Sequence, residues 1–138
     1  MLAIRSRLRV GRGSRFVDVV ALLNSRYEAP TPQLLIPIDL ARKLNLWPLT
    51  REAVEVTLET AGGPLKAWFY PRAAVVKVIT EDVKSREVLV DLIVSLLANE
   101  PLISDMLAKE LGIAVESFGK GLWRFRWEPK EKLRESAK

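Results

Sequence analysis

The stretch LIPIDLARKLNL, residues 35–46, decides the fold of this chain because a close copy of it follows in the second half. The copy is LISDMLAKELGI, residues 102–113, and the two align without gaps. Such self-similarity indicates a duplicated structural unit. We therefore expect a fold with an internal pseudo-two-fold repeat. The identical pairs are Leu35/Leu102, Ile36/Ile103, Leu40/Leu107, Ala41/Ala108 and Leu44/Leu111.

Each copy is predicted to form a short apolar strand followed by a short helix. In the first copy Leu34–Ile36 is the strand, and Pro37 suits a helix start because its missing N–H is not needed in the first turn. In the second copy Ser104 or Asp105 can cap the helix, and Gly112 can end it. Both helices are expected to bury their leucines.

Strand patterns occupy most of the remaining sequence. Leu2–Val10 alternates apolar residues with arginines, as a half-buried strand does. Val88–Val94 is almost entirely apolar, which indicates a central strand covered on both faces. The chain is thus predicted to be mostly β with two short helices. Further strands are expected at Arg15–Leu23, Ala53–Glu59, Leu65–Tyr70, Ala73–Thr80, Arg86–Leu97, Ala114–Ser117 and Leu122–Trp127.

Length and composition limit the classes of site. The chain has 138 residues, the size of one domain, which we assign to 1–127. Residues 128–138 are a charged C-terminal tail that we expect to fray. The sequence contains no histidine and no cysteine, which excludes thiol nucleophiles, histidine bases and Cys/His metal sites. We see no clustered carboxylate motif, so we expect neither a metal nor a cofactor.

Hydropathy and composition also suggest where the protein works. The N-terminal MLAIRSRLRV is interrupted by arginine too often for a signal-peptide core. The longest apolar run, Val88–Ala98, is far shorter than the roughly 20 residues of a membrane-spanning helix. We therefore expect a cytoplasmic protein. Many charges with little asparagine and glutamine are typical of a thermophile.

The positive charge is concentrated at the N-terminus. The net charge is +5, and residues 1–26 carry most of the excess arginine. A row of arginines can bind nucleic acid, because each neutralised phosphate releases counterions. The same row on an edge strand can instead be a solvated face that discourages aggregation. The candidate nucleic-acid residues are Arg5, Arg7, Arg9, Arg12 and Arg15.

The order of these elements, from Arg15 to Arg126, resembles the retropepsin-like aspartic proteases, including their small archaeal and bacterial relatives. In that family a helix of the LAxxLGL type follows an apolar strand, as Leu40–Leu46 does here. A hairpin that serves as a flap matches Leu58–Ala67, with Gly62 and Gly63 at its tip. The resemblance implies a closed retropepsin-like β-barrel, a homodimer and a peptide-binding cleft between the subunits.

The catalytic loop departs from the family pattern. Where the family has Asp-Thr/Ser-Gly, this chain has Asn24, Ser25 and Arg26. Aspartic proteases activate water with two carboxylates that share one proton, and an amide cannot replace them. Asp105 is expected to favour the dipole of its helix rather than to serve as the missing acid. The resemblance therefore implies a retained scaffold without its catalytic acid.

Three functional hypotheses follow. The first is a non-catalytic, dimeric module that binds a peptide or protein at Asn24, Ser25, Arg26, Tyr27, Gly62 and Gly63. The second is an active aspartic endopeptidase with an unrecognised catalytic acid. The third is a nucleic-acid-associated protein that uses the basic N-terminal hairpin. The sequence names no ligand and no biological process for any of them.

Overall fold

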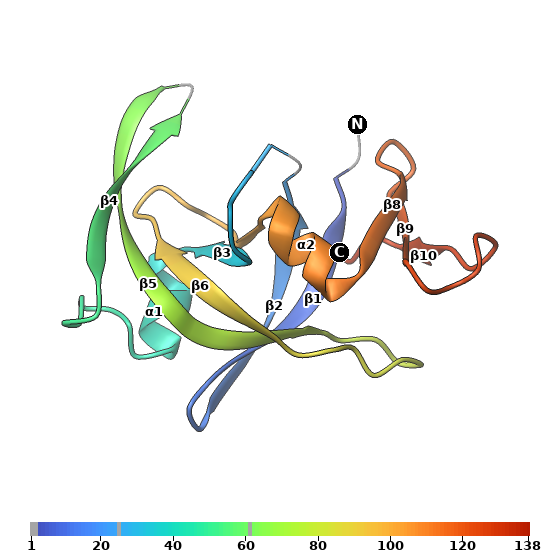
Figure 1. Ribbon diagram of the computed structural model, residues 1–138, viewed down its shortest axis with the longest axis horizontal. Coiled ribbons are helices and arrows are strands. Elements are labelled where there is room, and N and C mark those ends of the chain that lie inside the picture. The colour runs from blue at the N-terminus through green and yellow to red at the C-terminus, as the bar shows by residue number, and fades with distance from the viewer. Residues whose placement is uncertain (1–2, 25, 61) are drawn as a thin grey trace.

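The structure is a computed structural model that describes residues 3–24, 26–60 and 62–138 (Figure 1). The predicted composition of mostly strand with two short helices is confirmed, at 49% strand and 10% helix. The strands are β1 (Arg5–Arg12), β2 (Arg15–Leu23), β3 (Gln33–Ile36), β4 (Val54–Thr60), β5 (Gly63–Val78), β6 (Val88–Val94), β7 (Leu102–Ile103), β8 (Ile113–Ser117), β9 (Leu122–Phe125) and β10 (Arg134–Glu135). The helices are α1 (Ile38–Lys43) and α2 (Asp105–Leu111).

Six strands close into a barrel, which confirms the closed β-barrel predicted from sequence. The main sheet has the order β1-β2-β7-β3-β6-β5-β4, and an additional antiparallel pairing of β1 with β5 closes it. β4 lies outside the barrel as the first strand of a hairpin with β5. A separate sheet of order β10-β9-β8 forms from the C-terminal part of the chain. No helix among the described residues is long and apolar enough to cross a membrane.

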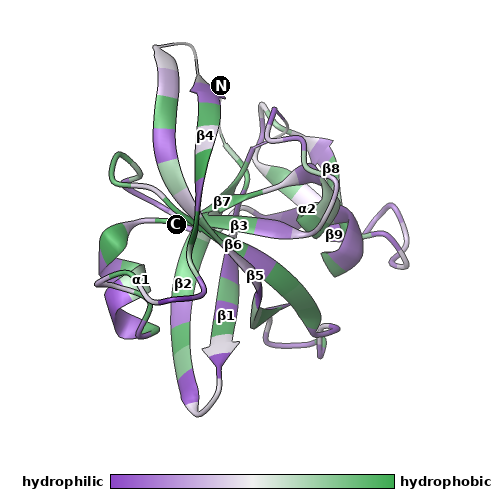
Figure 2. Ribbon diagram, turned by 60° about the vertical axis from the view of Figure 1, so that its left-hand side comes forward, coloured by the Kyte–Doolittle hydropathy of each residue, from purple (hydrophilic) through white to green (hydrophobic). Residues whose placement is uncertain are grey.

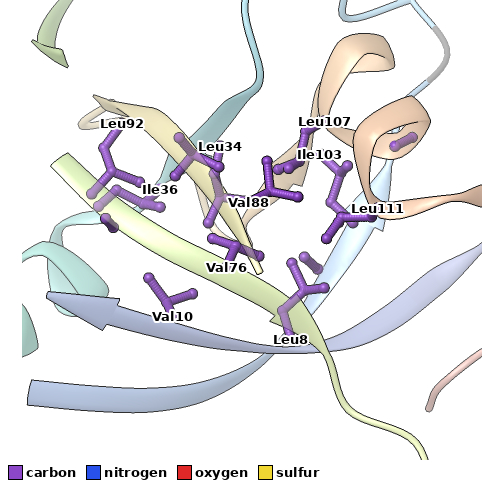
Figure 3. Packing of buried hydrophobic residues seen from close by; sticks show 14 of the residues in the cluster. Leu8, Val10, Leu34, Ile36, Val76, Val88, Leu92, Ile103, Leu107 and Leu111 are labelled. Atoms are coloured by element: carbon purple, nitrogen blue, oxygen red, sulfur yellow. The ribbon is translucent and has the colours of Figure 1, made fainter. Parts of the chain in front are cut away.

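The barrel interior is filled by aliphatic side chains from opposite ends of the sequence (Figure 3). Figure 2 shows the corresponding pattern, with hydrophobic strands at the centre and alternating bands along β1, β2 and β4. Because β3, β6 and β7 are central strands covered by neighbours, most of their side chains are apolar, with Gln33 and Asp91 as buried polar exceptions. Fully buried examples are Leu8, Val10, Leu34, Ile36, Val76, Leu92, Ile103, Leu107 and Leu111.

The two sequence copies adopt closely matched backbone conformations. The residue before each helix is extended, with φ −75° and ψ 166° at Pro37 and φ −71° and ψ 163° at Ser104. Each helix is followed by a residue in the left-handed region, Asn45 with φ 61° and Gly112 with φ 79°. Of the two predicted caps for α2, Ser104 is the one used, since its side chain accepts the N–H of Leu107. The helix caps themselves differ, since α1 has no side-chain N-cap and ends at Leu44 with φ −95°, whereas α2 ends directly at the left-handed Gly112.

β5 differs from the sequence prediction, which divided it into Leu65–Tyr70 and Ala73–Thr80. It is one strand, because the residues between Tyr70 and Ala74 form a β-bulge that shifts the register without ending the strand. Arg72 takes a φ of 48° within this bulge. A bulge bends a strand without ending it. β5 can consequently pair with β4 in the hairpin and with β6 and β1 in the barrel.

The expectation that residues 128–138 fray is wrong. Arg134 donates to the carboxylates of Glu128, at 2.6 Å, and Asp82, at 2.9 and 3.0 Å. Its guanidinium also lies over the rings of Trp123 and Phe125, at 5.8 and 5.1 Å. Ala137 donates its N–H to the carbonyl of Arg5. The charged side chains therefore attach the C-terminal segment to the barrel, where composition alone indicated a solvated tail.

Acid should weaken this attachment through Glu128. Hydrogen bonds from Arg134 lower the pKa of the nearly buried Glu128 carboxyl from 4.5 to about 2. The resulting stabilisation is complete above the unfolded-state pKa and is lost as the pH falls from about 4.5 towards 2. We predict that Glu128→Gln lowers the free energy of unfolding by about 2 kcal/mol at neutral pH and flattens its decline in acid. Denaturant titrations at a series of pH values measure both effects.

The matched control is Glu131→Gln, which removes an exposed carboxylate of the same segment. It should leave both the stability and its pH profile within about 0.5 kcal/mol of the parent protein. Equal pH profiles for Glu128→Gln and the parent would contradict the role given to Glu128.

Candidate functional site

The loop that follows β2 is built on Asn24. Its N–H donates to the carbonyl of Ile103 at 3.3 Å, which continues the parallel pairing of β2 with β7. Its side-chain Oδ1 accepts the N–H of Arg26 at 3.1 Å, and its carbonyl accepts the N–H of Tyr27 at 3.0 Å. This is the local turn that asparagine favours. Ser25, which the sequence also assigned to the site, lies outside the described residues.

The loop that follows β6 begins in the same way. Ser95 donates its N–H to the carbonyl of Ile36 at 3.1 Å, and its Oγ accepts the N–H of Leu97 at 3.3 Å. Ile36 and Ile103 are aligned residues of the two sequence copies. Asn24 and Ser95 therefore take corresponding positions, and each closes a turn with its own side chain.

A chain of hydrogen bonds anchors the first loop to the centre of the barrel. Tyr27 donates to Oε1 of Gln33 at 3.0 Å, and Nε2 of Gln33 donates to Oγ1 of Thr31 at 3.2 Å. Thr31 in turn donates to Oδ2 of Asp91 at 2.6 Å, and the N–H of Arg72 donates to Oδ1 at 2.7 Å. Burial and the charge of Asp91 raise the pKa of Tyr27 well above its usual value. The phenol thus stays protonated and remains a donor.

Asp105 holds the loop from the other side. Its Oδ1 accepts the N–H groups of Ala29 at 3.0 Å and Met106 at 2.7 Å. Its own N–H donates to the carbonyl of Tyr27 at 2.8 Å. The expected helix-start position of Asp105 is confirmed, and its carboxylate also fixes the loop.

The sequence resemblance implies that Asn24 stands at the position of a catalytic acid, and the structure shows Asn24 as an amide that forms a turn. Asn24 cannot ionise, and its side-chain oxygen already accepts a hydrogen bond within the turn. The two carboxylates bonded to this loop, Asp91 and Asp105, accept backbone or hydroxyl donors that hold the loop in shape. Among the described residues, no group of three or more acidic side chains could hold a metal ion. In these contacts Asn24, Asp91 and Asp105 fix the shape of the loop.

The hairpin of β4 and β5 carries the other predicted binding residues. Gly62 lies in its turn and Gly63 opens β5 with a φ of 107°, which suits glycine. The hairpin and the loop after β2 project towards the same end of the molecule, the upper end in Figure 1. β4 ends the sheet order, so its outer edge has no partner strand within the described part of the chain.

The predicted basic residues are mostly occupied by intramolecular acceptors. Arg5 pairs with Glu100 at 3.0 Å, and Arg9 pairs with Asp18 at 2.8 Å. Arg12 and Arg15 donate to backbone carbonyls of Ala73 and Lys43 at 2.8 and 3.4 Å. Arg7 is exposed and forms no ion pair with any residue that the structure describes. Two of the five arginines are thus neutralised by an acidic partner, whereas Arg7, Arg12 and Arg15 form no ion pair with any residue that the structure describes.

No protein-family model matches this chain, and no curated protein matches it. Its site must be understood from its own contacts. Sequence reasoning missed the anchoring chain from Tyr27 to Asp91. Asp91 was nevertheless a signal, because it is the one acidic residue within the apolar run Val88–Val94. A buried carboxylate requires hydrogen-bond donors, and the loop after β2 supplies one of them.

Replacing Asp91 tests whether the loop depends on this anchor. Asp91→Asn exchanges one acceptor oxygen for an amide donor, which cannot receive both Thr31 and the N–H of Arg72. We predict a loss of about 1–3 kcal/mol in the free energy of unfolding. Asp39→Asn, at an 89% exposed side chain, is the control and should change it by less than about 0.5 kcal/mol. Equal stabilities in urea titrations would show that Asp91 is not an anchor.

Proposed function

We propose that this chain is a non-catalytic, retropepsin-like module that binds an extended peptide or protein segment in a cleft between two copies of itself. The observation that carries the proposal is the turn built on Asn24. It replaces a catalytic acid by an amide, and the hydrogen bonds of Asp91 and Asp105 keep the loop in one shape. A loop held on a rigid scaffold is suited to recognition.

The retropepsin-like part of the proposal is supported by the symmetry of the strand pairings. The order β1-β2-β7-β3-β6-β5 reads equivalently from both ends, because β2–β7 and β3–β6 are parallel and the other pairs are antiparallel. At its centre Leu35 pairs with Leu102, its aligned counterpart in the other sequence copy. A duplicated unit of three strands and a helix, β1-β2-β3-α1 and β5-β6-β7-α2, with the β4 hairpin strand inserted between the copies, accounts for this pattern.

The peptide is proposed to bind along the open outer edge of β4. An extended segment can add to a sheet edge through main-chain hydrogen bonds. Pro64 lies opposite Glu59 and has no N–H to donate to it. The two residues therefore suit a non-hydrogen-bonded pair, in which the N–H and C=O of Glu59 face away from β5. Hydrogen-bonded and non-hydrogen-bonded pairs alternate along an antiparallel pair of strands. Thr57 and Glu55, two and four residues before Glu59, therefore also direct their backbone groups towards the open edge of β4.

Two further features support binding between two subunits. Leu96 and Leu97, 54% and 75% exposed, lie on the loop that begins at Ser95 and can contact an apolar ligand side chain. β8 ends the order β10-β9-β8, so its outer edge can pair with β8 of a second copy. A homodimer would place two copies of the Asn24 loop about one axis.

Cleavage assays separate this proposal from an active endopeptidase. We predict that the parent protein cleaves no member of a peptide library across about pH 3–7, because it lacks the paired acid. Asn24→Asp restores a carboxyl group to each loop and is the variant in which weak cleavage is expected. Mass spectrometry of the library detects both results. Cleavage by the parent protein would overturn the non-catalytic assignment.

Strand addition can be tested at Thr57. We predict that Thr57→Pro abolishes binding to an array of random peptides, because it removes an N–H from the open edge of β4 while sparing the pairing with β5. Thr57→Ala is the matched control and should bind like the parent protein. Retained binding by Thr57→Pro would exclude this edge, and a monomeric mass by light scattering at micromolar concentration would exclude the two-subunit cleft.

A further inference from the structure

The two faces of β4 carry side chains of opposite character. Figure 2 shows an alternation of hydrophobic and hydrophilic bands along this strand. Successive side chains of a strand point to opposite faces. One face of β4 is therefore apolar, and the other is polar and carries two carboxylates. The apolar residues are Val54, Val56 and Leu58, and the polar residues are Glu55, Thr57 and Glu59.

The apolar face continues from β4 onto β5. Each apolar residue of β4 lies opposite another on β5, in the pairs Leu58/Leu65, Val56/Ala67 and Val54/Phe69. Val54 remains 52% exposed at the open edge. Cross-strand neighbours are the unit of stabilisation in a sheet. A segment added beside β4 would therefore meet an apolar neighbour at every second residue.

The polar face of the hairpin carries more negative than positive charge. Lys66 lies 3.5 Å from the carboxylate of Glu55, and both side chains are largely exposed. Glu59 lies opposite the uncharged Pro64 and forms no ion pair with a residue that the structure describes. The backbone groups of both glutamates face the open edge, so a strand added there would place its own side chains directly beside these carboxylates.

This arrangement disfavours a second copy of β4 as the added strand. If two β4 edges paired antiparallel about Thr57, Glu55 of each copy would lie opposite Glu59 of the other. Like charges directly opposite one another destabilise a pair of strands, whereas opposite charges stabilise it. The edge is therefore complementary to a segment with basic side chains at these two positions.

We propose that the β4 edge selects extended segments in which basic and apolar residues alternate. The pattern has five positions: basic, apolar, any residue, apolar, basic. The basic residues would lie beside Glu59 and Glu55, and the apolar ones beside Leu58 and Val56. The pattern reads the same in both directions, so it applies to antiparallel and parallel addition. The inference rests on the proposed strand addition and states which segments that edge accepts.

Three capped pentapeptides test the selection. Acetyl-Lys-Val-Thr-Val-Lys-amide matches the pattern, acetyl-Glu-Val-Thr-Val-Glu-amide reverses its charges, and acetyl-Lys-Ser-Thr-Ser-Lys-amide lacks its apolar residues. Affinities come from NMR titrations that follow the amide signals of β4. We expect the matched peptide to bind at least about fivefold more tightly than either of the others, because each of those loses two favourable cross-strand pairs.

The double variant Glu55→Gln/Glu59→Gln tests the two carboxylates while it keeps the main-chain edge. It should bind the matched and charge-reversed peptides with affinities within about twofold of each other. Glu81→Gln/Glu87→Gln is the matched control, because it removes two exposed carboxylates outside the hairpin and changes the net charge equally. This control should keep the preference of the parent protein for the matched peptide.

The outcomes distinguish the selection from the proposed function. Equal binding of all three peptides that Thr57→Pro abolishes would retain the edge as the peptide site and overturn the selection. An unchanged preference in Glu55→Gln/Glu59→Gln would overturn the role of the two carboxylates. Absence of binding by all three peptides at millimolar concentration would overturn both the selection and the edge as a peptide site.

Discussion

The antiparallel pairing of β3 with β7 is the contact on which the barrel depends. Leu34 faces Ile103 and Leu35 faces Leu102 at the centre of the sheet, and the outer edge of each strand pairs in parallel with β6 or β2. β7 has only two residues, so it cannot be stable alone. Because Leu34 and Ile103 are fully buried, their apolar surface compensates for the short hydrogen-bond ladder.

This central pairing also positions both loops of the candidate site. Asn24 and Ser95 each take their place by donating to a carbonyl of β7 or β3. The first loop then gains its shape from Asp91 and Asp105, one in the barrel wall and one at the start of α2.

The sequence predicted the fold well where a period or a repeat was present. The strand predicted at Arg15–Leu23 matches β2 with its correct bounds, and the repeat located both helices. The bulge in β5 was missed because Pro71 and Arg72 look locally like a strand end, and only the pairing partners on both sides keep the strand continuous. At the site, the position of Asn24 followed from the sequence, whereas its anchors did not. Thr31 and Asp91 lie far apart in the chain, and no local pattern links them.

The C-terminal segment was misjudged for a related reason. Its charge suggested solvent exposure, but Arg134 finds acceptors in Glu128 and in the distant Asp82. Long-range ion pairs have no signature in local composition. The basic N-terminal strand illustrates the same point, because Glu100 and Asp18 neutralise arginines that look free in the sequence.

The attachment of Ser136 and Ala137 to Arg5 has a consequence for how the protein folds. Ser136 follows Arg5 by 131 positions in the chain, and the barrel itself closes through distant strands. Contacts of such long range must overcome the entropy of closing a large loop before they contribute stability. Folding should therefore be slow for a chain of this size, and on the ribosome the backbone of Arg5, at the start of β1, stays without these partners until residue 137 has emerged.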